Sequence, residues 1–195
     1  MKGQFSTPIL HESGSFLHAD SQSNLCYVLH YISKTMCMEG LVSSIHFLLV
    51  DDEEVLIETI AQRLRLKGFI VDCALSGNEA LNQLGKSDTI DIVVLDIQMP
   101  DLNGMSILEI LKAKHPLVEV IMLTGHATIQ SAVEALKFGA YDYLLKPCDF
   151  NDLISKANKA ISRKREREGR ILNVKLKPYI SDREREELIS NIMKE

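Results

Sequence analysis

Between residues 45 and 163 the hydrophobic positions follow two alternating patterns. Five short runs are almost wholly apolar, at 45–50, 69–74, 91–96, 118–123 and 142–146. Between the runs, apolar residues recur every three or four positions, over 54–66, 77–85, 105–114, 128–138 and 150–163. Uniformly apolar runs indicate strands buried on both faces, and the intervening spacing indicates amphipathic helices. The pattern therefore predicts an α/β fold, a five-stranded parallel sheet with helices on both faces and right-handed crossovers.

The chain ends differ from this middle region, which we take as one domain over residues 44–163. Residues 1–43 are rich in Ser and His and follow no sustained period, so we expect a poorly ordered extension, with a functional arm as the alternative. Met36 and Met38 offer later starting points for translation. Residues 164–195 form a charged tail with too few large apolar side chains for a second core, so we expect no output domain there.

The tail itself shows helical signals. In the run RKRERE (163–168) glutamates alternate with arginines, which is typical of a solvated extension of the preceding helix. A partner-binding or oligomerising segment is the alternative. Lys177-Pro178 interrupts the pattern, and Ser181 with Glu184 forms a capping box for a last helix over 182–194.

Composition narrows the class of protein. The net charge of −5 argues weakly against a general nucleic-acid binder. The four cysteines (Cys26, Cys37, Cys73 and Cys148) form no CxxC pair, which favours a reducing compartment over a disulfide or zinc framework. No apolar run reaches membrane-span length, and the stretch 25–32 lacks the features of a signal peptide. We expect a cytoplasmic protein without membrane contact.

Reactive side chains follow four of the five predicted strands. The first strand ends in Asp51 and Asp52, the third in Asp96, the fourth in Thr124 and the fifth in Lys146. In a parallel sheet the carboxyl ends of the strands meet at one edge, where ligands bind in open α/β folds. These side chains are therefore expected to lie close together.

The chemistry follows from the charges. Neighbouring carboxylates repel and raise one another's pKa unless a cation neutralises them, and Mg²⁺ suits an all-oxygen site. Asp96 is the candidate nucleophile, because carboxylates attack phosphorus to form acyl phosphates. Lys146 and the Thr124 hydroxyl could bind the oxygens of the transferred group, and Gly125 leaves room for it to enter.

Each residue alone also has a simpler interpretation. Asp51 and Asp52 could cap the next helix, Lys146 could be a solvated lysine, and Thr124 could belong to a turn. Only the joint placement at one edge favours a site. His126 lacks a second His or Cys nearby that would make it a catalytic base, and His46 is best interpreted as a packed or surface histidine.

The segments that carry these residues are DDEE, LDIQMPDLNG, LTGHA and YDYLLKP. Together they resemble the receiver domain of two-component response regulators, over residues 45–162. The resemblance implies a doubly wound, flavodoxin-like sheet with strand order 2-1-3-4-5, the order known for the chemotaxis member of the family.

The resemblance also implies roles for the site residues. Asp96 would be the phosphoacceptor, receiving phosphate from a sensor histidine kinase or a phosphotransfer protein. Asp52, Asp96 and the backbone carbonyl of Gln98 would bind Mg²⁺ directly, and Asp51 would act through water. Lys146 would bind the phosphoryl group, and the peptide bond between Lys146 and Pro147 would be cis.

Further roles are implied for the output. Thr124 and Tyr143 would form a switch pair, and the side chains of Gln98 and His126 would influence the lifetime of the phosphate. The surface over 128–138, 142–146 and 150–163 would bind an unknown downstream protein or a second copy of the chain, without direct DNA binding.

The predicted function is a stand-alone phosphorelay switch. It is not an enzyme beyond catalysing its own phosphoryl transfer and autodephosphorylation. One alternative is a Mg²⁺-dependent phosphatase of the haloacid dehalogenase type, whose DxDxT pattern is replaced here by DDEEV at 51–55. The other is a receiver-like scaffold that works without phosphorylation, against which the intact acidic residues and Lys146 argue.

Overall fold

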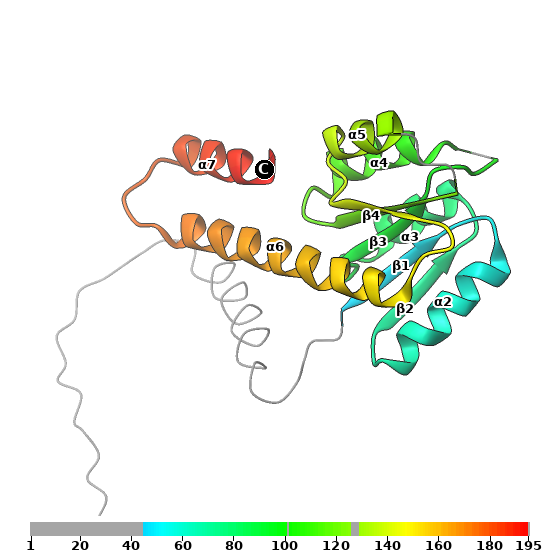
Figure 1. Cartoon of the computed structure of the whole chain (residues 1–195). Helices are drawn as coiled ribbons and strands as arrows, with labels where there is room; N and C mark the ends of the chain where they lie inside the picture. Colours follow the sequence, from blue (N-terminus) through cyan, green and yellow to red (C-terminus); the bar gives the residue numbers. More distant parts are fainter. Residues whose placement is uncertain (1–44, 101, 126–128, 195) are drawn as a thin grey trace, which may run out of the picture. The chain divides into compact units, whose positions relative to one another are not determined.

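The computed structural model describes residues 45–100, 102–125 and 129–194, which form a parallel sheet covered by helices (Figure 1). The sheet order is β2-β1-β3-β4-β5, and every neighbouring pair is parallel. The predicted fold class and strand order are confirmed. The strands are β1 (His46–Val50), β2 (Ile70–Ala74), β3 (Ile92–Asp96), β4 (Glu119–Thr124) and β5 (Asp142–Leu145). The helices are α2 (Glu54–Leu66), α3 (Gly77–Lys86), α4 (Gly104–Lys114), α5 (Ile129–Lys137), α6 (Phe150–Leu176) and α7 (Asp182–Lys194).

The described residues do not test every prediction made from the sequence. The extension over residues 1–43 and the side chain of His126 lie outside the described residues. The described helices include none long and apolar enough to cross a membrane. The cytoplasmic location stays a prediction.

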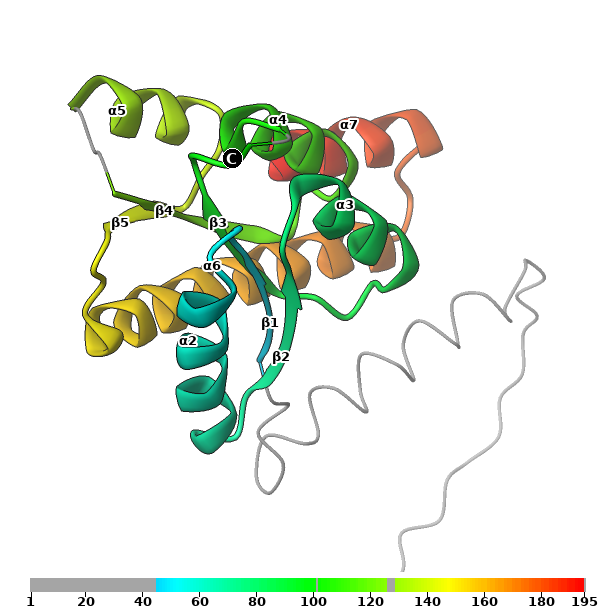
Figure 2. The same ribbon diagram turned by 90° about the vertical axis from the view of Figure 1, so that its right-hand side faces the viewer.

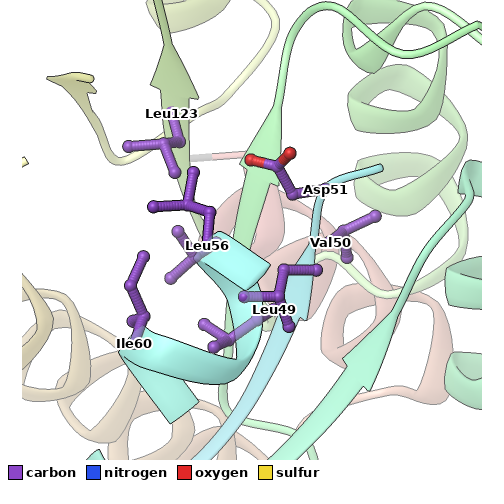
Figure 3. Close-up of a pocket in the computed structure, with 8 residues that line it drawn as sticks. Leu49, Val50, Asp51, Leu56, Ile60 and Leu123 are labelled. Atoms are coloured by element: carbon purple, nitrogen blue, oxygen red, sulfur yellow. The ribbon is translucent and has the colours of Figure 1, made fainter. Parts of the chain in front are cut away.

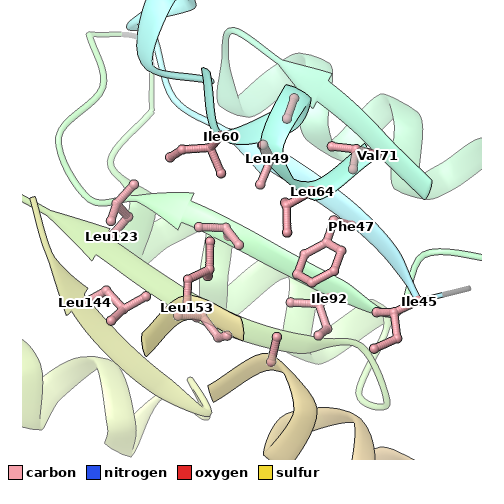
Figure 4. Packing of buried hydrophobic residues seen from close by; sticks show 14 of the residues in the cluster. Ile45, Phe47, Leu49, Ile60, Leu64, Val71, Ile92, Leu123, Leu144 and Leu153 are labelled. Carbon is pink, nitrogen blue, oxygen red and sulfur yellow. The ribbon is translucent and has the colours of Figure 1, made fainter. Parts of the chain in front are cut away.

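Alternating side chains of the central strands build two separate cores. On β1, Phe47 and Leu49 pack against α2 and α6 on one face, where the buried residues surround the ring of Phe47 (Figure 4). Leu48 and Val50 of the same strand belong to a second core with buried residues of α3, α4 and α5. These helices cover the other face of the sheet (Figure 2). All residues of β1, β3 and β4 are buried, as their largely apolar sequences predict. The prediction is wrong for the edge strands β2 and β5, which are only partly buried. Burial on both faces fixes the three strands that carry Asp51, Asp96 and Thr124.

The loop after β3 is held tightly against that strand. Asn103 caps α4 through its side-chain oxygen, which accepts a hydrogen bond from the N–H of Met105. A Cβ atom on Gly104 would lie only 2.2 Å from the carbonyl oxygen of Asp96. Glycine is therefore required at this position, because any side chain would displace the backbone of Asp96.

Helix α6 continues well past the end of the predicted domain. Its buried face changes from apolar residues to Lys164 and Arg167, which are 6% and 5% exposed. The ammonium group of Lys164 donates to Oδ1 of Asp91 at 2.7 Å. This part of the helix is therefore held against the amino end of β3. The predicted helical extension is confirmed, but several of its basic residues face inward and do not form a solvated face.

Glu119, the first residue of β4, is the centre of this docking. Its side chain is fully buried and paired with Arg163, with Arg167 at 3.3 Å and with Lys112 at 3.7 Å. A buried carboxylate is stable only with such compensation. Arg167 also donates to the carbonyl oxygens of Pro116 and Met193, each at 3.0 Å. One arginine therefore links the sheet, the loop before β4 and the last turn of α7.

Helix α7 begins as predicted. Ser181 Oγ accepts a hydrogen bond from the N–H of Glu184 at 3.2 Å, which satisfies one of the free donors at the helix start. The helix then spans Asp182–Lys194, the range expected from the capping box.

Candidate functional site

The predicted reactive residues lie together at the carboxyl edge of the sheet. Asp51 follows β1, Asp96 ends β3 and Thr124 ends β4, and their exposed fractions are 2%, 3% and 2%. Lys146 directly follows β5, and its backbone N–H donates to the carbonyl oxygen of Thr124 at 2.8 Å. The parallel sheet thus gathers residues from four separate segments into one small region.

Lys146 is the centre of the ion pairs in this region. Its Nζ lies 2.5 Å from Oδ2 of Asp51, 3.4 Å from Oδ2 of Asp96 and 3.4 Å from Oε1 of Glu53. The Lys146 side chain is only 15% exposed, so its charge interacts with the buried carboxylates of Asp51 and Asp96 with little screening by water. The bond between Lys146 and Pro147 is cis, as the resemblance implies. Lys146 therefore points into the acidic region and is not a solvated lysine.

The electrostatics match this crowding. Burial raises the pKa of Asp96, the charge of Asp51 raises it further, and Lys146 and the N–H of Gln98 oppose the shift. For Lys146, burial works to lower the pKa, but the hydrogen bond and charge of Asp51, followed by those of Asp96, outweigh it and raise the pKa. The charged form of Asp96 is thus destabilised by its surroundings, whereas the charged form of Lys146 is stabilised.

The acidic site (Asp51, Asp52 and Asp96) has the composition of a magnesium site. One oxygen from each of the three carboxylates lies within 4.8 Å of the others. Oδ1 of Asp96 is buried and has no hydrogen-bond partner among the described residues. A buried, unpartnered carboxylate oxygen is costly unless a cation binds it, and oxygen-only donors suit Mg²⁺. The residues present therefore fit a magnesium ion.

A small hollow lies beside Asp51, beneath α2. It is lined by Leu49, Val50, Asp51, Leu56, Ile57, Ile60, Val94 and Leu123. Figure 3 shows Asp51 as the polar member of this otherwise aliphatic set. An aliphatic lining offers nothing to bind a charged ligand, so the hollow is a packing gap and the chemistry belongs to the acidic edge above it.

The interpretation that Asp51 and Asp52 only cap the helix after β1 is wrong. The cap of α2 is Glu53, without a side-chain cap hydrogen bond. Asp51 instead accepts the backbone N–H of Glu53 through Oδ1 at 3.0 Å, while its other oxygen faces Lys146. Asp52 is exposed at the rim. His46 is packed, as interpreted from the sequence, with Nε2 2.9 Å from Asp72 and Nδ1 2.9 Å from Thr89.

Gln98 and Tyr143, two further residues with predicted roles, are both exposed to solvent in part or in full. Gln98 is exposed in the loop after β3. Tyr143 lies in the middle of β5 with 36% exposure, on the opposite face of the strand from the buried Leu144. Tyr143 is therefore partly exposed in this structure.

The sequence reasoning missed Glu53 as a partner of Lys146. Its only trace in the sequence is the position of the residue in DDEE, and Glu54 occupies an equally acidic position. The reasoning also missed the buried Glu119, although an acid at the start of an otherwise apolar strand is a usable sign of a buried ion pair.

Comparison with known proteins agrees with this geometry. The family described as "Response regulator receiver domain" matches residues 47–158. A putative NtrX-like response regulator of Rickettsia conorii is 39% identical over 148 residues, which are 73% of this chain and 30% of the relative. The transcriptional regulatory protein ZraR of Escherichia coli is 37% identical over 119 residues, which are 61% of this chain and 27% of that protein. This chain thus matches less than a third of each relative's length.

Solved structures support the same fold. The crystal structure of the receiver domain of NtrX from Brucella abortus is similar with a TM-score of 0.56 and 33% sequence identity. The similarity covers 60% of this chain and 98% of that domain. The matched portion of this chain is thus equivalent to a whole domain of the solved protein.

Proposed function

The chain belongs to the response regulator receiver domain family, and from this premise we propose that it accepts a phosphoryl group on Asp96. Receivers of this family act as signalling switches in two-component phosphorelays. The single observation that carries the proposal is the position of Lys146, whose ammonium group is paired with both Asp51 and Asp96. Transfer of an anionic phosphoryl group to a buried carboxylate requires a nearby cation that stabilises the negative charge.

In the proposed site Mg²⁺ would be held by Asp52, Asp96 and the carbonyl oxygen of Gln98, with Asp51 acting through a water molecule. When bound, the ion supplies positive charge that stabilises the phosphoryl oxygens during transfer. The support is the unpartnered Oδ1 of Asp96 and the proximity of the three carboxylates.

The transfer itself would take place at Asp96. A carboxylate oxygen of Asp96 forms a bond to phosphorus while the bond from phosphorus to the donor's histidine nitrogen breaks. The nitrogen leaves with the bonding electron pair and is protonated by solvent. Lys146 and the hydroxyl of Thr124 would each hold an oxygen of the transferred group, which keeps it in line for attack.

The response would be a population shift between two conformations. In the family-based proposal, Thr124 moves toward the phosphoryl group and Tyr143 turns inward from the partly exposed position it has here. The surface of α5, β5 and α6 then binds a downstream protein or a second copy of the chain with changed affinity. Phosphorylation can shift this equilibrium only through interactions that differ between the two states.

A protein partner fits the described surface better than DNA does. Arg163, Lys164 and Arg167, three of the four basic residues in the run 163–168, pair internally with Glu119 and Asp91. We therefore propose a receiver domain over 44–163 followed by a docked helical tail, phosphorylated by a histidine kinase or phosphotransfer protein. The relatives' role in transcription belongs to those longer proteins.

The test is incubation with acetyl phosphate and Mg²⁺, followed by intact mass measurement. A gain of about 80 Da, the mass of a captured phosphoryl group, is expected in the wild type and absent in Asp96→Asn. Faster loss of the acyl phosphate from the folded protein than from the denatured protein would show autodephosphorylation. Rapid hydrolysis of many phosphate monoesters would instead favour the phosphatase alternative, and no mass gain would favour the scaffold.

A further inference from the structure

Glu53 is a third carboxylate at Lys146, and the proposed transfer mechanism does not use it. Its Oε1 accepts a hydrogen bond from Nζ of Lys146 at 3.4 Å. The backbone of Glu53 is fixed in place, because its N–H donates to Oδ1 of Asp51 at 3.0 Å. Its side chain is 65% exposed, far more than the carboxylates of Asp51 and Asp96, which are 3% and 4% exposed.

The number of hydrogen-bond donors makes this contact important. An ammonium group has three N–H donors and no acceptor. Lys146 has three carboxylate partners, Asp51, Asp96 and Glu53, as many as its ammonium group has donors. An incoming phosphoryl oxygen therefore competes with these carboxylates for Lys146.

Exposure decides which partner leaves. Asp51 is buried and makes the shortest contact, and Asp96 is the residue that reacts. Glu53 is bound least tightly, because its carboxylate is 65% exposed and can be solvated when released. The contact between Glu53 and Lys146 is thus the one that has to open.

On this basis we propose that Glu53 is a positioning residue that occupies Lys146 before phosphorylation and slows phosphoryl transfer to Asp96. The inference rests on the proposed function. It assigns this chain an internal competitor for the phosphoryl group, with Lys146 moving from the Glu53 carboxylate to the incoming oxygen.

The test compares single variants with acetyl phosphate at saturating Mg²⁺, with the phosphorylation rate measured against donor concentration. Glu53→Gln should react roughly two- to fivefold faster than wild type, the range for loss of one exposed ion pair. Glu54→Gln is the matched control, because Glu54 is also exposed and acidic but is not among the ion-pair partners of Lys146 on the described chain. Its rate should equal that of wild type.

Glu53→Asp separates positioning from general repulsion of the anionic donor. It keeps the negative charge but shortens the side chain by one methylene, which breaks the contact with Lys146. Acceleration in both Glu53→Asp and Glu53→Gln supports the proposal. A wild-type rate in Glu53→Asp, or an unchanged rate in Glu53→Gln, overturns it while the proposed function stands. If wild type and Glu54→Gln take up no phosphate, the proposed function fails, and this inference with it.

Discussion

Nζ of Lys146 lies 3.4 Å from Oδ2 of Asp96, although Lys146 follows β5 and Asp96 ends β3, and β4 separates these two strands in the sheet. The contact spans two strand positions because Lys146 is a long side chain that reaches back across the carboxyl edge. It depends on the sheet order and would be lost if β4 and β5 were arranged otherwise. The site is therefore a direct product of the parallel topology.

The raised pKa of Asp96 predicts a pH-dependent cost to the fold. Between the ordinary pKa of 3.8 and the raised folded value, the folded state binds more protons than the unfolded state. The stability contributed by this group is therefore greatest at low pH and falls as the pH rises through that window. Asp96→Asn removes the effect, so wild-type stability relative to the variant should decline with rising pH. Urea unfolding without Mg²⁺ measures this, and a constant difference between the two proteins would contradict it.

Lys112 predicts the opposite trend at alkaline pH. Burial lowers its pKa from 10.5 to about 8, and the nearby Glu119 only partly opposes this. Between those values the unfolded state binds more protons, so the contribution of Lys112 to stability rises with pH, by roughly 3 kcal/mol in total. Lys112→Met should abolish this rise, while Lys114→Met, at an exposed position of the same helix, should retain it. Equal pH profiles for the wild type and Lys112→Met would show that Lys112 does not titrate in this way.

Arg167 predicts that the tail is an integral part of the folded domain. Arg167→Met leaves one side of the buried Glu119 unpaired and removes the donor to the carbonyl of Met193. Loss of a partner from a buried ion pair typically costs about 3–5 kcal/mol, and two other cations remain here, so we expect about 3 kcal/mol. Amide exchange in α7 should also become faster. The control Arg165→Met lies at an exposed position of α6 and should change neither measurement. Unchanged exchange in α7 would mean that Arg167 does not hold that helix.

The close approach of Gly104 to the backbone of Asp96 predicts that a side chain at position 104 slows phosphorylation. In Gly104→Ala the new Cβ meets the carbonyl oxygen of Asp96 at 2.2 Å, so the loop has to move away from the phosphoacceptor. A loss of about 1–3 kcal/mol in stability is expected from this overpacking, together with slower phosphorylation. Gly85→Ala, where nothing lies within 4 Å of the new Cβ, should be neutral or slightly stabilising. Normal phosphorylation of Gly104→Ala would disprove the coupling.

Sequence patterns predicted most of the fold because burial on both faces leaves a direct mark on composition. β3 ends at Asp96 and α2 spans Glu54–Leu66, as the apolar spacing indicates. The inward position of Lys164 could not be predicted, because its spacing on α6 matches the buried face but its charge suggests the opposite. Only the three-dimensional position of Asp91 resolves the conflict. Tyr143 and Leu144 lie on opposite faces of β5, as alternation along a strand requires.

Glu53 shows the other limit of sequence reasoning. Four acids in a row follow β1, and no local rule says which of them reaches a lysine more than ninety residues later. The answer depends on the turn between β1 and α2 and on the path of β5. Long-range pairs at the edge of a sheet are thus predictable as a group, but not contact by contact.

The most direct test of the central claim is to locate the phosphate chemically. After incubation with acetyl phosphate and Mg²⁺, borohydride reduces an aspartyl phosphate to homoserine, which peptide mass mapping assigns to one residue. We predict homoserine at position 96 in the wild type and at no position in Asp96→Asn. Homoserine at another aspartate, or none in a wild-type protein that binds Mg²⁺, would contradict the assignment of Asp96 as the phosphoacceptor.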